Sequence, residues 1–183
     1  MLKRYSALDS NYLPGNFPLD GKKSVMFQEI KNLNLQQLAC WPNTLSETEN
    51  FFKKKLNENN SPDFNKGIIK KEYSLWRMEP FKWWVLEKEL DFPNELGTNL
   101  DMSHSFTCIN ISGDNSTLLL NRHLPIDLRE NKFPTASSAS SSIHHVSIKL
   151  WRSKYAYNLF IPRGFALSLC CLLYTSPSPR DRG

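Results

Sequence analysis

Three of the five tryptophans of this chain lie within nine residues, between Trp76 and Trp84. The same stretch contains two cations, Arg77 and Lys82, and the carboxylate of Glu79. Tryptophan rings stack on ligands and on cations, so this composition is compatible with a recognition site. It is also compatible with a β-hairpin packed into a core or against a partner, in which Arg77 pairs with Glu79 or lies flat on a ring.

We favour the packing interpretation, with Arg77 and Glu79 fixing the turn of the hairpin. The residues that we single out for packing or interface contacts are Trp76, Arg77, Glu79, Trp83, Trp84 and Trp151.

Histidine and cysteine form no catalytic or metal-binding pattern. His144 and His145 fall in a predicted strand, where adjacent side chains point to opposite faces, so we expect no shared metal ion. Cys108 lies in mid-strand and is expected to be buried and inert, because nothing near it in sequence would lower its pKa. The four cysteines include no CxxC pair, which argues against a disulfide framework and a zinc knuckle.

The sequence also lacks the loop motifs of nucleotide and acyl-transfer sites. Ser112-Gly113-Asp114 is not followed by the further glycines of a dinucleotide fingerprint, and no nucleophile elbow is present. We therefore predict no catalytic, cofactor-binding or metal-ligating residue in this chain.

A net charge of +5 raises the question of nucleic-acid binding. The basic residues are scattered apart from Lys53-Lys54-Lys55, which fall at the end of a predicted helix, where cations complement the helix dipole. We expect a solvated helix end and no nucleic-acid partner. The first residues contain no apolar signal core, and no stretch approaches the roughly 18 apolar residues of a membrane span, so we expect a cytoplasmic protein without membrane contact.

The hydrophobic pattern begins after an irregular start. The hydrophobic residues within 1–24 show neither helical nor strand periodicity, and we expect an arm that lies on the surface or on a partner. A pair of strands is predicted next, over Val25–Ile30 and Leu33–Trp41.

A helix and a hairpin follow. Thr44 and Glu47 predict a capping box that opens a helix over Leu45–Leu56. Tyr73–Met78 and Lys82–Leu86 are strand-like and are joined by a turn at Glu79-Pro80-Phe81.

The second half repeats this scheme. Ser137–Ser142 is either a flexible linker or the start of a strand. The predicted elements are a strand at His104–Ile111, a helix at Asp114–Asn121, strands at Val146–Leu150 and Tyr155–Ile161, and a final helix from about Arg163.

The repeated order of strand, helix, strand and strand predicts an α+β protein of two β-α-β-β units with antiparallel sheets, related to split-βαβ or ferredoxin-like folds. We place the first unit at residues 25–90 and the second at 100–170, and we interpret them as a weak internal duplication.

Residues 171–183 match the translation of a transposase-type sequencing adapter, codon by codon from Cys171 to Asp181. The alternative is a disordered tail rich in proline and serine. We expect adapter read-through rather than genuine protein.

Several short motifs, in order along residues 25–170, resemble the gamma subunit of heterotetrameric sarcosine oxidase. They are Leu38-Ala39-Cys40-Trp41-Pro42, Trp76-Arg77-Met78-Glu79-Pro80 with Trp83-Trp84, Asp101-Met102-Ser103-His104, Ile111-Ser112-Gly113, Leu124-Pro125-Ile126-Asp127-Leu128 with Phe133-Pro134, Leu150-Trp151-Arg152, and Ile161-Pro162-Arg163 with Phe165-Ala166. The resemblance implies a fold like the folate-binding region of aminomethyltransferase, the T protein of glycine cleavage.

The resemblance also implies a place beside alpha, beta and delta subunits in a complex that oxidatively demethylates sarcosine and passes the one-carbon unit to tetrahydrofolate. FAD, FMN and NAD would then lie on the alpha and beta subunits and zinc on delta, with no cofactor in this chain. The alternative function is a stand-alone folate-binding or one-carbon-transfer module.

Overall fold

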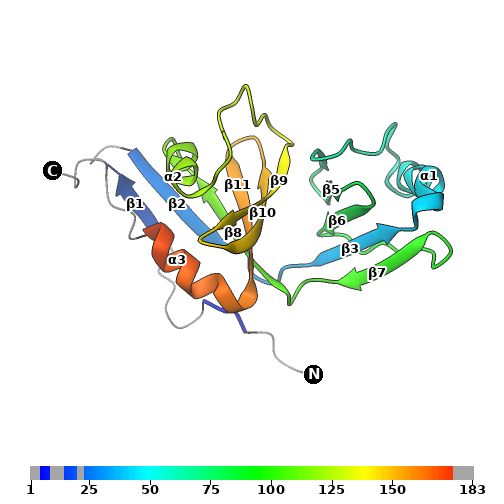
Figure 1. Ribbon diagram of the computed structural model, residues 1–183, viewed down its shortest axis with the longest axis horizontal. Helices are drawn as coiled ribbons and strands as arrows, with labels where there is room; N and C mark the ends of the chain where they lie inside the picture. Colours follow the sequence, from blue (N-terminus) through cyan, green and yellow to red (C-terminus); the bar gives the residue numbers. More distant parts are fainter. Residues whose placement is uncertain (1–4, 9–14, 20–22, 175–183) are drawn as a thin grey trace. The chain divides into compact units, whose positions relative to one another are not determined.

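The computed structural model describes residues 5–8, 15–19 and 23–174 (Figure 1). Its strands are β1 (Gly15–Leu19), β2 (Lys23–Glu29), β3 (Leu35–Cys40), β4 (Gly67–Ile69), β5 (Ser74–Glu79), β6 (Lys82–Leu86), β7 (Gly97–Asp101), β8 (Phe106–Ser112), β9 (Ser138–Ile143), β10 (Val146–Arg152) and β11 (Ala156–Pro162). Its helices are α1 (Leu45–Leu56), α2 (Ser116–His123) and α3 (Ala166–Tyr174), with single 3₁₀ turns at Pro42–Thr44 and Arg163–Phe165.

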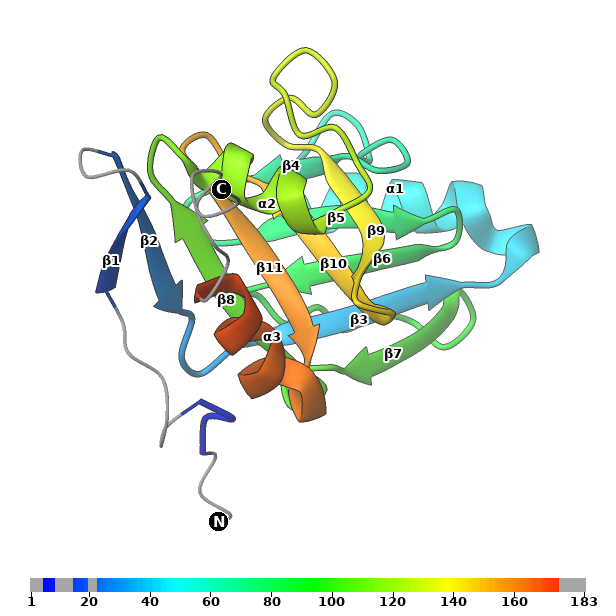
Figure 2. The same ribbon diagram turned by 60° about the vertical axis from the view of Figure 1, so that its left-hand side comes forward.

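The strands form two sheets, and the chain divides into two compact units around them. One sheet has the order β1-β2-β8-β11-β10-β9 and the other the order β4-β5-β6-β3-β7 (Figure 2). The five-stranded unit comprises residues 33–104 and 136–139, and the six-stranded unit comprises the described residues of 1–32, 105–135 and 140–183. The predicted α+β class with antiparallel sheets is confirmed.

The internal duplication is visible in the strand order. β3, α1, β4, β5 and β6 follow one another in the chain as β8, α2, β9, β10 and β11 do, and the two sets occupy the same positions in their sheets. The strand that directly precedes each set in the chain pairs with the first strand of the other set. β2 directly precedes β3 but pairs with β8, whereas β7 directly precedes β8 but pairs with β3.

This exchange makes one prediction wrong. The strands predicted at Val25–Ile30 and Leu33–Trp41 both form, but they lie in different sheets instead of pairing with each other. Asn32, which joins them, has a positive φ of 54°. The first compact unit therefore does not follow the predicted range of 25–90, since β2 belongs with β8.

The N-terminal arm is also more regular than predicted. β1 and the start of β2 lie within residues 1–24 and pair with each other in antiparallel fashion. Residues 5–8 contact the six-stranded unit, where Leu8 is buried and the hydroxyl of Ser6 donates a 2.5 Å hydrogen bond to Glu29. Residues 1–4, 9–14 and 20–22 lie outside the described residues.

The helix predicted over Leu45–Leu56 is confirmed as α1, but the predicted capping box at its N-terminus does not form. Thr44 makes no side-chain cap, because its hydroxyl donates to the backbone oxygens of Trp41 (3.1 Å) and Leu96 (2.6 Å). The 3₁₀ turn at Pro42–Thr44 leads directly into the helix. The helix ends at Leu56, and Asn57 caps it in the left-handed conformation that asparagine tolerates.

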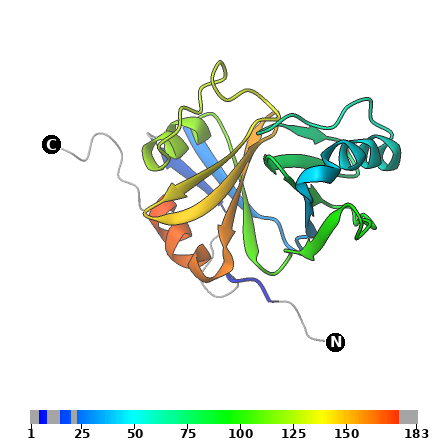
Figure 3. The ribbon, with the colours of Figure 1, turned by 45° about the vertical axis from the view of Figure 1, so that its right-hand side comes forward.

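The core of the five-stranded unit lies between α1 and one face of the sheet (Figure 3). The Phe52 ring of α1 lies 5.2 Å from Trp83 of β6, measured between ring centroids. This core comprises Leu38, Cys40, Phe52, Leu56, Tyr73, Leu75, Trp83, Val85, Leu90 and Phe92.

The final helix begins close to the predicted position and includes residues 171–174. Leu173 is buried, and the Tyr174 ring meets Phe27 edge-on at 4.8 Å. Residues 175–183 lie outside the described residues, and the adapter origin of 171–183 stays a prediction.

Candidate functional site

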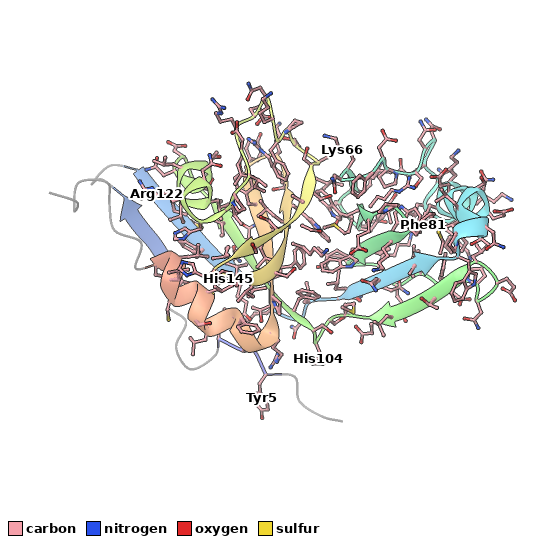
Figure 4. The ribbon with its side chains drawn as sticks, in the orientation of Figure 1. Tyr5, Lys66, Phe81, His104, Arg122 and His145 are labelled. Atoms are coloured by element: carbon pink, nitrogen blue, oxygen red, sulfur yellow. The ribbon has the colours of Figure 1, made fainter. Side chains whose placement is uncertain are left out.

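The tryptophan-rich stretch forms the β5–β6 hairpin, as predicted. Trp76 pairs with Trp84 across the hairpin, and Arg77 pairs with Trp83. Because neighbouring side chains of a strand point to opposite faces, Arg77 and Trp83 share the face toward α1, and Trp76 and Trp84 share the other. The three tryptophans are at most 2% exposed, so both faces of the hairpin are buried. Phe81 in the turn is 39% exposed (Figure 4).

Arg77 joins this hairpin to α1. Its guanidinium lies over the Trp83 ring, 5.0 Å from the centroid, which was one of the two predicted arrangements. It donates to the backbone oxygen of Pro80 from Nε (3.2 Å) and Nη2 (2.8 Å), and Nη1 meets Glu49 Oε1 at 3.0 Å. The carboxylate of Glu79, proposed as the partner from sequence, pairs with Lys82 at 2.8 Å.

Glu49 was missed because the contact spans 28 residues. Only its position one helical turn before Phe52, on the helix that covers the hairpin, could have suggested it.

The opposite face of the hairpin is packed by its neighbouring strands. Trp76 lies over Gly67 of β4, so a Cβ atom at that position would overlap the indole ring. Trp84 donates a 3.1 Å hydrogen bond from Nε1 to Gln37 Oε1 of β3. Trp83 Nε1 is buried and has no hydrogen-bond partner in the described part of the chain. Trp83 therefore acts through ring packing and its π face.

The same arrangement recurs in the six-stranded unit at Trp151-Arg152. Trp151 is fully buried, with its ring centroid 4.3 Å from that of Phe160. Arg152 pairs across the hairpin with Tyr157 and lies over its ring at 5.3 Å.

The Arg152 guanidinium also fixes the loop after α2. Nη1 donates to the backbone oxygens of Leu128 (3.0 Å) and Phe133 (2.6 Å), and Nη2 pairs with Glu130. Arg77 and Arg152 therefore each contact an aromatic ring, a carboxylate and backbone oxygens.

A polar pair is duplicated as well. Gln37 and Trp84 are bonded between β3 and β6, and Asn110 and Asn158 are bonded at 2.7 Å between the equivalent strands β8 and β11. The Gln37–Trp84 pair lies next to the cross-strand pair Leu38–Trp83, and the Asn110–Asn158 pair lies next to Ile111–Tyr157. The two polar pairs therefore hold equivalent positions in the two sheets.

The histidines are placed differently from the prediction. His144 and His145 form the turn between β9 and β10, with positive φ angles of 45° and 70°, and are not strand residues. His123 ends α2 and is half-buried. Its pKa is lowered by burial, then by the nearby charges of His144 and Arg122. Among residues 5–8, 15–19 and 23–174, no three or more His, Cys, Asp or Glu side chains gather in a way that could hold a metal ion.

Burial acts on the cysteine side chains of both units. Cys108 is fully buried in β8, as predicted. Burial raises the pKa of Cys170 to about 12, and burial also raises the pKa of Cys40. Since the thiolate is the nucleophile, neither group has the character of a reactive cysteine.

The comparisons with known proteins support the fold. No family model matches the sequence, and no curated protein matches it either. Among solved structures, a chain of the heterotetrameric sarcosine oxidase from Corynebacterium sp. U-96, in complex with pyrrole 2-carboxylate, matches with a TM-score of 0.69.

The chain has the fold of a sarcosine oxidase subunit. The match covers 85% of this chain and 85% of the sarcosine oxidase chain, at 16% sequence identity. In the described part of the chain, no helix has the length and hydrophobicity that crossing a bilayer requires.

Proposed function

We propose that this chain is a non-catalytic gamma subunit of a heterotetrameric sarcosine oxidase, with a structural role in assembly. The observation that carries the proposal is the fold match over 85% of both chains. The ordered sequence motifs, from Leu38 to Ala166, agree with it.

In the proposed complex, sarcosine is oxidatively demethylated to glycine, and the one-carbon unit passes to tetrahydrofolate. The alpha and beta subunits would carry FAD, FMN and NAD, the delta subunit would carry zinc, and the complex would be cytoplasmic. This chain would contribute no cofactor ligand.

The use of the aromatic and cationic side chains supports a structural role. The aromatic faces and cations that could have formed a ligand site are engaged in packing, since Arg77 covers Trp83 and Arg152 covers Tyr157. Both guanidiniums also donate to backbone oxygens within their own units.

Co-expression tests the proposal. The chain is expressed alone and together with the alpha, beta and delta subunits encoded in the same genome. Alone it should be colourless and inactive, and less soluble than in the complex. With its partners it should co-purify in a stable complex that oxidises sarcosine.

Full sarcosine oxidation by an alpha-beta-delta assembly of unchanged stability would overturn the structural role. Saturable binding of a tetrahydrofolate derivative to the isolated chain would instead favour the stand-alone folate-binding module.

A further inference from the structure

β7 forms one edge of the five-stranded sheet. It pairs with β3 on one side, and no strand among the described residues pairs with its other side (Figures 1 and 2). Thr98, Asn99, Leu100 and Asp101 are exposed, and Leu100 is 53% exposed. The strand has no lysine and no proline, two devices that commonly protect an edge from pairing with another chain.

The hydrogen bonds at both ends of β7 show which of its amides point outward. Met102 N donates to Leu35 O at 2.8 Å, and Trp41 N donates to Leu96 O at 2.9 Å. Residues of an antiparallel strand alternate between bonding to one neighbour and to the other. Thr98 and Leu100 therefore bond to β3, while the backbone groups of Asn99 point to the open edge.

The other edge of this sheet is covered within the same unit. Gly67 N of β4 donates to Ala136 O at 2.9 Å, and Ser138 N donates to Asn65 O at 2.9 Å. Lys66 also bridges to Ser137 through the backbone, and its Nζ donates to the Ser137 hydroxyl at 2.9 Å. The open edge of the five-stranded sheet is thus the β7 edge.

The duplication shows what the equivalent edge carries in the six-stranded sheet. β2 holds the position beside β8 that β7 holds beside β3. There β1 adds a further antiparallel strand on the outer side, with Gly15 opposite Phe27. Asn99 lies opposite Leu38 of β3, and Phe27 lies opposite Ile111 of β8. Because Leu38 and Ile111 hold equivalent positions in the two sheets, Asn99 and Phe27 are equivalent residues of the two edges. The β7 edge therefore has the geometry of an edge that accepts one more strand.

The charge around β7 indicates the chemistry of its partner. No lysine or arginine occurs between Lys88 and Arg122, although the whole chain has a net charge of +5. The segment that leads into β7 and β7 itself carry four exposed carboxylates, those of Glu89, Asp91, Glu95 and Asp101. A strand that bears lysine or arginine complements this edge.

We propose that β7 accepts an extended segment of another subunit, which pairs with it in antiparallel orientation as β1 pairs with β2. The segment carries basic side chains toward the carboxylates and an apolar side chain beside Leu100. Main-chain hydrogen bonds supply affinity in this mode of recognition, and alternate side chains supply specificity. The proposal rests on the proposed function, because the strand comes from a subunit of the same complex.

The test uses two variants of the full chain, co-expressed with alpha, beta and delta subunits. Asn99→Pro removes an outward N–H without removing a bond to β3, and an edge strand tolerates proline there. Leu100→Lys places a cation at the exposed apolar position. The matched control is Leu118→Lys, at a 47% exposed leucine on α2. Each variant alone should keep the circular dichroism spectrum and melting temperature of the wild type.

Both β7 variants should weaken assembly by about tenfold, as expected for a lost backbone hydrogen bond and an obstructed edge. Leu118→Lys should assemble normally. Hydrogen exchange at Asn99 should slow in the wild-type complex relative to the isolated chain.

If the wild type assembles and both β7 variants assemble equally well, with no slowing of exchange, the strand proposal is overturned and the proposed function stands. If the wild type does not join the complex, both are overturned. Dimerisation of the isolated chain that Asn99→Pro abolishes would identify a second copy as the occupant, and would also overturn the proposal.

Discussion

Arg77 and Arg152 occupy equivalent positions in the two repeats and make equivalent contacts. Each follows a buried tryptophan, lies over an aromatic ring of the next strand, and donates to backbone oxygens. A planar guanidinium can satisfy a ring face, a carboxylate and a carbonyl together, which an ammonium cannot. The Trp-Arg pair is therefore a packing device that the fold uses twice.

This role predicts that Arg77→Lys destabilises the chain even though the charge is retained. We expect a loss of about 1–2 kcal/mol in the free energy of unfolding, since the paired bonds to Pro80 and the stacking on Trp83 are both weakened. Urea denaturation measures it. Lys82→Gln is the control, because the Lys82–Glu79 pair is exposed and should change stability by less than about 0.5 kcal/mol. Equal effects of the two substitutions would contradict this account.

The residues of the hairpin were predictable from composition, but most of their partners were not. The clustering of Trp76, Trp83 and Trp84 already predicted a packed hairpin. The contact of Arg77 with Glu49 is set by where α1 lies on the sheet, and no local pattern encodes that position. Local electrostatics favoured Glu79, two residues away, and Glu79 instead pairs with Lys82.

At the scale of elements, the end of α1 is fastened to the sheet by Tyr73, which directly precedes β5. The Tyr73 hydroxyl donates to Glu58 Oε1 at 2.8 Å and to Leu56 O at 3.3 Å, and Lys70 pairs with Glu58 at 3.0 Å. The hydrogen bonds from Tyr73 and Lys70 lower the pKa of Glu58. Burial and Glu58 raise the pKa of Tyr73, so its hydroxyl remains a donor over the whole working range.

Tyr73→Phe should therefore cost about 1–2 kcal/mol of unfolding free energy at neutral pH, in a pH-dependent way. A carboxyl group whose pKa is lower in the folded state stabilises that state fully above its ordinary value of 4.5. The contribution is lost as the pH falls through the folded pKa.

The difference between wild type and Tyr73→Phe should thus shrink below about pH 4.5. Urea denaturation at pH 7 and at pH 3 measures it. Tyr155→Phe, at a 77% exposed tyrosine, is the matched control and should have little effect at either pH. A deficit that is the same at both pH values would contradict the role of Glu58.

Elements whose signal is local were predicted well. α1 matches its predicted range, because its apolar spacing and the prolines and glycines around it are contained in one segment. His144 and His145 were interpreted as strand residues, but they form the turn directly before the alternating Val146, Ile148 and Leu150. Their positive φ angles reflect a two-residue hairpin connection without glycine, which hides the usual signal.

At the scale of the whole molecule, the two repeats exchange their leading strands. β2 completes the sheet of the second repeat, and β7 completes the sheet of the first. The hydrophobic pattern identifies strands but not their partners, and adjacent strands in sequence pair more often than distant ones. The sequence therefore favoured pairing β2 with β3. The exchange depends on pairing between strands that are far apart in the sequence, and both repeats must be present for it to form.

The exchange predicts that neither repeat folds fully without the other. Cleaving the chain between β6 and β7 gives fragments 1–93 and 94–183, each of which leaves a leading strand without its partner. In the first fragment β2 lacks β8, and in the second β7 lacks β3. Each fragment alone should show a poorly dispersed amide NMR spectrum.

Mixing the two fragments should restore the dispersion of the intact chain, because the backbone groups of β2 and β7 then find their partners. A tandem pair of independent domains would behave differently, since each half would fold alone and mixing would change nothing. Native-like spectra from both separate fragments would thus contradict the exchange. An intact chain with Asn32→Gly, at the positive-φ residue between β2 and β3, is the control and should fold normally, since glycine accepts that conformation.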